Sequence, residues 1–121
     1  MRRTLAAALL LAGCSAPPVL RSAPSSDGRL VAREVATGDA LLLDIGLAGG
    51  GPFTTIAELK GWTEPFPLAW RGATVEAALP CAPTTLHGAL DQQVTLPEVA
   101  RPVTVRLTRS ARCRLRLIPL R

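Results

Sequence analysis

Apolar and polar residues alternate with a period of two along short stretches of this chain, from residue 30 onward. Such alternation is typical of β-strands that bury one face. The stretch 40–47 contains three successive leucines, which predicts a central strand covered on both faces. The pattern predicts strands over residues 30–35, 40–47, 53–59, 68–70, 74–79, 93–96, 103–108 and 112–117, and it leaves 84–91 ambiguous between a strand and a helical turn.

Turn-forming residues separate these stretches, and no stretch has a convincing helical period. The chain has 11 Pro and 10 Gly among 121 residues, a length that suits one domain. Pro65 and Pro67 exclude a helix where three aromatic residues recur at intervals of four. We therefore expect an all-β fold: a small antiparallel β-sandwich, immunoglobulin-like in architecture, with a small β-barrel as the alternative.

The most regular alternation lies at the C-terminal end, over 103–108 and 112–117, with residues 109–111 between them. Two strands of one hairpin must keep their apolar residues on one face, and this requirement sets the register. The expected hairpin places Leu107 opposite Cys113, Val105 opposite Leu115, and Val103 opposite Leu117.

The N-terminal residues have the order of an export signal. Met1-Arg2-Arg3 is positively charged, an apolar run follows, and small residues precede a cysteine. The run from Leu5 to Ala12 has eight residues, whereas a membrane-spanning helix needs about 20. The tetrapeptide Leu11-Ala12-Gly13-Cys14 resembles the lipobox of bacterial lipoproteins. That resemblance implies that Cys14 is lipidated and becomes the N-terminus once the preceding peptide is removed.

The resemblance also implies a location and a division of the chain. Residues 1–13 are expected to be the signal peptide, 14–28 the acylated cysteine with a flexible Ser- and Pro-rich tether, and 29–121 one β domain. The lipid makes a membrane of the bacterial cell envelope the first partner. Ser15 follows the lipidated cysteine, and in well-studied Gram-negative lipoproteins Asp at this place favours the inner membrane. The resemblance therefore favours the outer membrane.

With Cys14 lipidated, two of the three cysteines remain, Cys81 and Cys113. An even pair in an exported protein predicts a disulfide between them. Metal binding is the alternative, but two cysteines and His87 lack a fourth ligand and a closely spaced pair. No metal site and no cofactor are predicted.

Charge is distributed unevenly along the chain. Residues 15–100 contain five basic and nine acidic residues, whereas 101–121 contain seven arginines and no acid. One interpretation is a solvated, charge-protected sheet face. The other is an anion-binding face on the predicted hairpin, because the planar guanidinium fork suits phosphate and carboxylate. The arginines of that candidate face are Arg106, Arg112, Arg114 and Arg116.

Trp62, Phe66 and Trp70 are candidates for a sugar-stacking platform, with ordinary core packing as the alternative. Catalysis has little support: His87 is the one histidine, and no nucleophile motif accompanies it. We therefore expect no enzymatic activity.

The sequence predicts a monomeric, membrane-anchored envelope lipoprotein that acts as a binding or structural module. One alternative is a ligand-binding module that recognises an anionic polymer, lipid or glycan through the arginine-rich hairpin. Another is an accessory subunit of a secretion, pilus or transport machine with an envelope protein as its partner. Nucleic acid is not favoured as a ligand.

Overall fold

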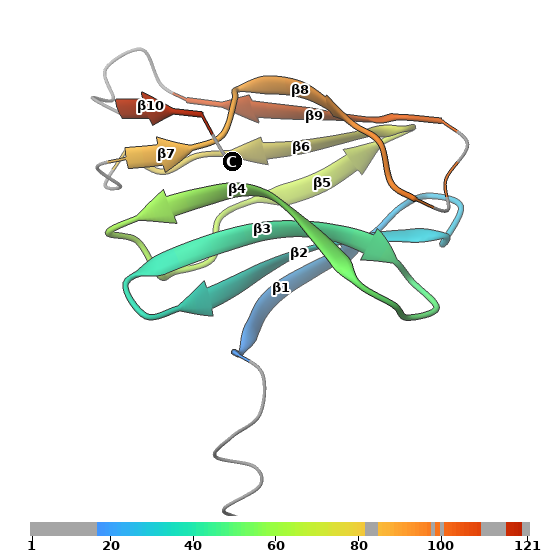
Figure 1. Cartoon of the computed structure of the whole chain (residues 1–121), viewed down its shortest axis with the longest axis horizontal. Coiled ribbons are helices and arrows are strands. Elements are labelled where there is room, and N and C mark those ends of the chain that lie inside the picture. The colour runs from blue at the N-terminus through green and yellow to red at the C-terminus, as the bar shows by residue number, and fades with distance from the viewer. Residues whose placement is uncertain (1–16, 82–84, 98, 100, 110–115, 120–121) are drawn as a thin grey trace, which may run out of the picture.

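A computed structural model describes residues 17–81, 85–97, 99, 101–109 and 116–119. The described chain forms strands and turns without a helix (Figure 1). Its strands are β1 (Val19–Pro24), β2 (Leu30–Thr37), β3 (Ala40–Leu47), β4 (Phe53–Lys60), β5 (Leu68–Arg71), β6 (Thr74–Ala78), β7 (Thr85–His87), β8 (Asp91–Val94), β9 (Val103–Thr108) and β10 (Arg116–Ile118).

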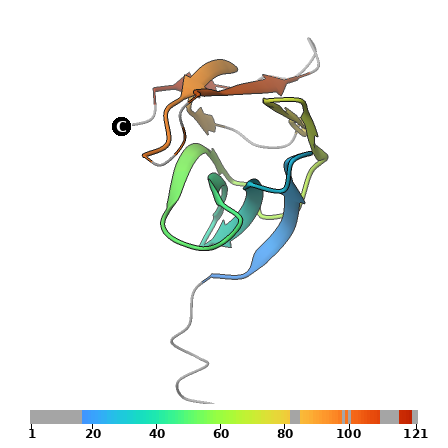
Figure 2. The ribbon, with the colours of Figure 1, turned by 90° about the vertical axis from the view of Figure 1, so that its right-hand side faces the viewer.

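The strands form two sheets that stack face to face (Figure 2). The first sheet has the order β1-β2-β3-β4-β7-β10, and the second has the order β5-β6-β9-β8. Most neighbours are antiparallel, but β7 with β10 and β6 with β9 are parallel. The predicted small β-sandwich is confirmed, and neither sheet closes into a barrel. The connectivity differs from the ABED and CFG sheets of immunoglobulin domains, because the first four strands here form a meander.

The core lies between the sheets and follows the period of two. β3 is central in its sheet, as predicted, and Leu41, Leu43 and Ile45 on its inner face are fully buried. Leu42, on the opposite face, is only partly buried, so the predicted cover on both faces is incomplete. The same alternation buries Val103, Val105 and Leu107 on β9. Ile56 interrupts the alternation on β4 because β4 bulges there: Ala57 and Thr55 pair with the consecutive β3 residues Leu43 and Asp44, and Ile56 between them has no partner. The other buried apolar residues are Ala32, Val35, Ala40, Ala57, Leu59, Phe66, Val75, Ala77, Leu79, Leu86 and Leu96.

The predicted tether is wrong over residues 19–28. Residues 19–24 form β1, which pairs with β2 from Val19 opposite Val35 to Pro24 opposite Val31. The Ser- and Pro-rich composition was compatible with this because an edge strand uses only part of its hydrogen-bonding capacity and tolerates proline. A turn at residues 25–29 then leads into β2, so the domain begins about ten residues earlier than the composition indicates.

The predicted C-terminal hairpin is also wrong. β9 lies between β6 and β8 in the second sheet, and β10 pairs with β7 in the first sheet. Val105 therefore faces Val75 on one side and Gln92 on the other, not Leu115. Alternation had assigned the buried face of β9 correctly, but it carries no information about which strand lies beside it.

Candidate functional site

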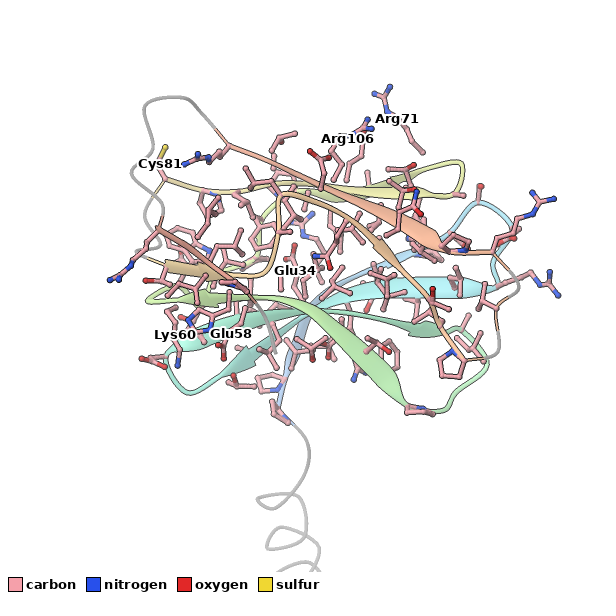
Figure 3. All side chains as sticks on the ribbon, turned by 45° about the horizontal axis from the view of Figure 1, so that its top comes forward. Glu34, Glu58, Lys60, Arg71, Cys81 and Arg106 are labelled. Carbon is pink, nitrogen blue, oxygen red and sulfur yellow. The ribbon has the colours of Figure 1, made fainter. Side chains whose placement is uncertain are left out.

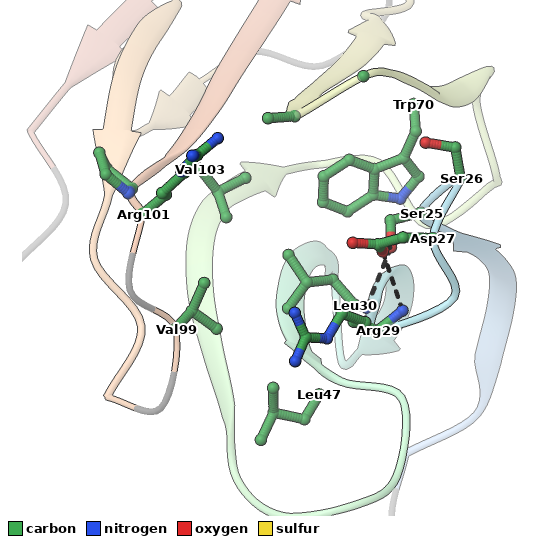
Figure 4. A pocket seen from close by; sticks show the side chains of 13 residues that line it. Ser25, Ser26, Asp27, Arg29, Leu30, Leu47, Trp70, Val99, Arg101 and Val103 are labelled. Carbon is green, nitrogen blue, oxygen red and sulfur yellow. Dashed lines mark hydrogen bonds between the residues drawn. The ribbon is translucent and has the colours of Figure 1, made fainter.

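A cavity of about 610 Å³ opens at one end of the sandwich, between the two sheets (Figure 4). It is formed by the β1–β2 turn, the end of β3, the β5–β6 turn and the connection between β8 and β9. We call it the end cleft. Its lining residues are Ser25, Ser26, Asp27, Arg29, Leu30, Leu47, Trp70, Gly72, Ala73, Val99, Arg101, Pro102 and Val103.

The floor of the end cleft is apolar. Leu30 and Leu47 are directly opposite each other at the ends of β2 and β3, and both are partly exposed. Val99 and Val103 face them from the second sheet's side of the cavity (Figure 4). Trp70 forms a further wall. The floor therefore offers apolar surface that the protein itself covers only in part.

The Trp70 wall is held in place by a hydrogen bond between the two sheets. The indole Nε1 of Trp70, on β5, donates to the carbonyl oxygen of Ala23, on β1, over 2.7 Å. The bond joins the edge strands of the two sheets on one side of the sandwich. Because the indole nitrogen is engaged, the ring presents its apolar surface to the cavity.

The β1–β2 turn, on the rim of the end cleft, is fixed by side-chain hydrogen bonds. Ser25 Oγ donates to Asp27 Oδ1 over 2.7 Å, and the backbone N–H of Arg29 donates to the same oxygen over 3.0 Å. Ser25 Oγ in turn accepts the N–H of Leu30 at 3.1 Å. The hydrogen bond from Ser25 is the main reason that the pKa of Asp27 lies below its usual value. The turn is thus a preformed element that carries Arg29 at its end.

Arg29 and Arg101 are the two basic residues of the end cleft, and both are exposed. Within the described residues, neither forms an ion pair, whereas Arg21, Arg33, Arg71 and Arg106 each lie within 4.0 Å of a carboxylate. The first arginine comes from the β1–β2 turn and the second from the connection before β9. Together they make the rim of an apolar cavity positively charged.

The arginines that the sequence grouped on one face are not together. Arg106, on the outer face of the second sheet, lies 3.8 Å from Glu76 and 3.5 Å from Asp91 (Figure 3). Arg116 belongs to β10 of the first sheet. Arg112 and Arg114 lie outside the described residues. The predicted hairpin face therefore does not form. The charge of Arg106 is instead balanced by Glu76 on β6 and Asp91 on β8, two strands that the sequence analysis had not placed beside β9.

The aromatic residues divide between the core and the end cleft. Phe66 is 2% exposed and belongs to the core, as the packing interpretation expects. Trp62 packs partly against the core, and its Nε1 donates to the carbonyl oxygen of Glu64 over 2.6 Å. Trp70 alone of the three lines the cavity. A platform built from all three rings is therefore excluded by the burial of Phe66.

Glu34 is a fully buried carboxyl group on the inner face of β2 (Figure 3). Its Oε1 accepts the backbone N–H of Phe66 over 3.0 Å and lies 3.8 Å from the Nε of Arg21, on β1. Its Oε2 has no hydrogen-bond partner in the described structure. Burial raises the pKa of Glu34 to about 7, against the opposing effects of the Phe66 N–H and Arg21. The sequence offers no signal for this, because nothing local distinguishes Glu34 from an exposed glutamate.

Other candidate chemistry is sparse. His87 Nδ1 lies 3.6 Å from Glu58 Oε1 across β7 and β4, and the pair is partly exposed. No group of three or more His, Cys, Asp or Glu residues within the described ranges is arranged to hold a metal ion. Cys81 lies just after β6, but Cys14 and Cys113 fall outside the described residues, so the lipidation and the disulfide stay predictions.

Comparison with family models, with curated proteins and with solved structures gives no significant match. The part of the chain that the structure describes has no helix with the length and apolar character to cross a bilayer.

Proposed function

We propose that this chain is a bacterial envelope lipoprotein whose β-sandwich is a non-catalytic binding module. The observation that carries the anchoring is the Leu11-Ala12-Gly13-Cys14 motif directly after a charged and then apolar start. The observation that carries the binding is the end cleft, an apolar cavity with two arginines on its rim that have no ion-pair partner in the described structure. Cavities of this size are typical of small-molecule sites.

The strand β1 changes what the anchor implies. If the mature chain starts at Cys14, only residues 14–18 precede β1, because the chain is already paired at Val19. Five extended residues span at most about 17 Å. The domain is then held close to the membrane surface, not at the distance that a fifteen-residue tether would allow.

The end cleft lies at the end of β1 that is remote from the anchor. β1 runs from Val19, which follows residues 14–18, to Pro24 (Figure 1). The cleft begins at Ser25, in the turn after β1. The lipid and the binding site thus occupy opposite ends of this strand. We propose that the anchor sets the location of the protein, with the outer membrane favoured by Ser15. We also propose that the cleft binds its ligand at the end of β1 opposite the lipid anchor.

Cell fractionation tests the anchor. The full chain is expressed in a Gram-negative host, and Cys14→Ser is expected to move it from the membrane to the soluble fraction as a folded domain. Ser15→Asp, which keeps the lipobox, is expected to remain in the membrane fraction but to shift from the outer to the inner membrane on a density gradient. A Cys14→Ser chain that stays with the membranes would overturn the proposed anchoring.

A further inference from the structure

We infer that the end cleft binds an amphiphile with one anionic head group, its apolar body on the cleft floor and its head between Arg29 and Arg101. The inference rests on the proposed binding function and names the class of ligand. The head-group chemistry, a carboxylate or a phosphate, is the part that the two arginines determine.

The apolar floor of the end cleft indicates that the ligand has an apolar body. Leu30 and Val99 pack against the core but are only partly buried, and Leu47, opposite Leu30, is also only partly buried. The Trp70 ring stands over them with its nitrogen already bonded to Ala23, so it has no hydrogen bond left for a polar ligand. Water on this floor has few polar partners, whereas an alkyl chain would remove the apolar surface from water.

The positive charge on the rim of the end cleft indicates that the head group of the ligand is an anion. Arg29 and Arg101 have no ion-pair partner among the described residues, and their guanidinium groups present bidentate donors that match carboxylate or phosphate oxygens. Asp27 is the one acidic residue of the cleft. Its Oδ1 accepts the hydrogen bonds from Ser25 and from the Arg29 N–H, and the charge of Arg29 also helps to lower the pKa of its carboxyl group, so Asp27 offsets part of the Arg29 charge. Two positive charges against one negative charge leave a rim that favours an anion.

The arrangement also disfavours the alternative sites. The other arginine-containing clusters, at Arg33 on the first sheet and at Arg71 and Arg106 on the second, have carboxylates beside the guanidinium groups. Arg106 borders a second hollow, but its lining residues, Asp91, Gln92, Gln93 and Thr104, are all polar and offer little apolar surface to an alkyl chain. A ligand that needs both an apolar body and a negative head therefore fits the end cleft better than any other described surface.

Ligand binding can be measured from the fluorescence of Trp70, because this residue lines the end cleft. The Cys14→Ser chain is used because it needs no detergent, which would compete for the cleft. Trp62→Phe is added so that fluorescence comes from Trp70 alone. Decanoate, decyl phosphate and decyltrimethylammonium are titrated below their critical micelle concentrations. Decanoate or decyl phosphate is expected to change Trp70 emission saturably, and the cation is expected to have no such effect. Preference between the two anions identifies a carboxylate or a phosphate head.

Matched variants locate the binding. Arg29→Gln and Arg101→Gln are each expected to weaken anion binding about tenfold, since each removes a charge-assisted contact. Arg71→Gln and Arg106→Gln remove arginines of the outer second sheet and are expected to leave the affinity unchanged. Leu47→Phe narrows the floor and is expected to abolish binding without loss of the folded state.

Three results would overturn the inference. They are equal binding of the cation, unchanged affinity in the Arg29→Gln/Arg101→Gln double variant, and absence of binding by a folded protein at millimolar anion. These outcomes are distinct from failure of the anchor, which is read from fractionation. A chain that is released by Cys14→Ser and does not bind decanoate or decyl phosphate keeps its proposed location and loses only the ligand assignment.

Discussion

Glu34 predicts an unusual pH dependence of stability. Its carboxyl group is 0% exposed, on the inner face of β2. It receives one backbone hydrogen bond, and the Nε of the half-exposed Arg21 lies 3.8 Å away. One of its oxygens has no hydrogen-bond partner in the described structure. Because these contacts replace hydration only in part, burial favours the neutral acid and raises its pKa to about 7.

The magnitude follows from the difference between the folded and unfolded states. The pKa of Glu34 is 4.5 in an unfolded chain and about 7 in the folded one. A difference of about 2.5 units corresponds to about 3 kcal/mol. Below the unfolded pKa both states are protonated, and this contribution to stability is fully present. As the pH rises from 4.5 to about 7, the unfolded chain loses its proton first, so folding becomes less favourable; the loss is complete above the folded pKa.

Replacement of Glu34 by Gln isolates this effect. The Gln side chain has the same shape, and its carbonyl oxygen can accept the Phe66 N–H as the carboxyl does. We expect Glu34→Gln to unfold at nearly the same denaturant concentration as the native chain near pH 4. Near pH 8 we expect the variant to be more stable by about 3 kcal/mol, because it has no charge to bury.

The assay is urea unfolding followed by tryptophan fluorescence at a series of pH values. The difference in unfolding free energy between Glu34→Gln and the native chain cancels the titration of all other groups. Glu64→Gln is the matched control, since Glu64 is exposed in the loop that precedes Phe66. A difference between native and Glu34→Gln that stays constant from pH 4 to 8 would refute the reasoning.

Two further substitutions test the packing of the first sheet and its connection to the second. Gly46→Ala would place a Cβ 2.9 Å from the Phe53 ring, so we expect a loss of about 1–3 kcal/mol, whereas Gly49→Ala meets open space and should change stability by less than about 0.5 kcal/mol. Gln92→Ala removes a 2.9 Å hydrogen bond from the second sheet to the carbonyl at the β4 bulge, so we expect a loss of about 1 kcal/mol, with Gln93→Ala near zero. Urea unfolding measures the free energy of unfolding for each substitution and its control. If a substitution and its control changed that free energy equally, the contact proposed to explain the difference would be contradicted.

Much of the strand pattern could be predicted from local chemistry. β3 occupies the predicted 40–47 and lies in the interior of its sheet, with the apolar residues Leu41, Leu43 and Ile45 on the face that meets the core. Weak patterns were less informative. β8 begins at Asp91, two residues before the predicted 93–96, since its first inward residue is Gln92, a polar side chain that the alternation could not assign to the core.

The end cleft could not be predicted from the sequence. The end cleft joins residues from turns that are about 70 positions apart, and its two arginines stand in ordinary loop sequences. Arg101 was counted within a basic C-terminal segment, but a cavity beside Arg29 exists only because the β1–β2 turn and the chain before β9 meet at one end of the sandwich.

The all-β class and the buried face of most strands could be read from the sequence, because each depends on residues that are neighbours in the chain; the export signal, which is equally local, stays a prediction. The tertiary structure decided that residues 19–24 join the sheet and that β9 and β10 lie in different sheets. It also decided that Glu34 is buried without full solvation. The physical reason is that a period of two states which side of a strand is apolar, whereas strand partners and cavities depend on how all the faces pack together.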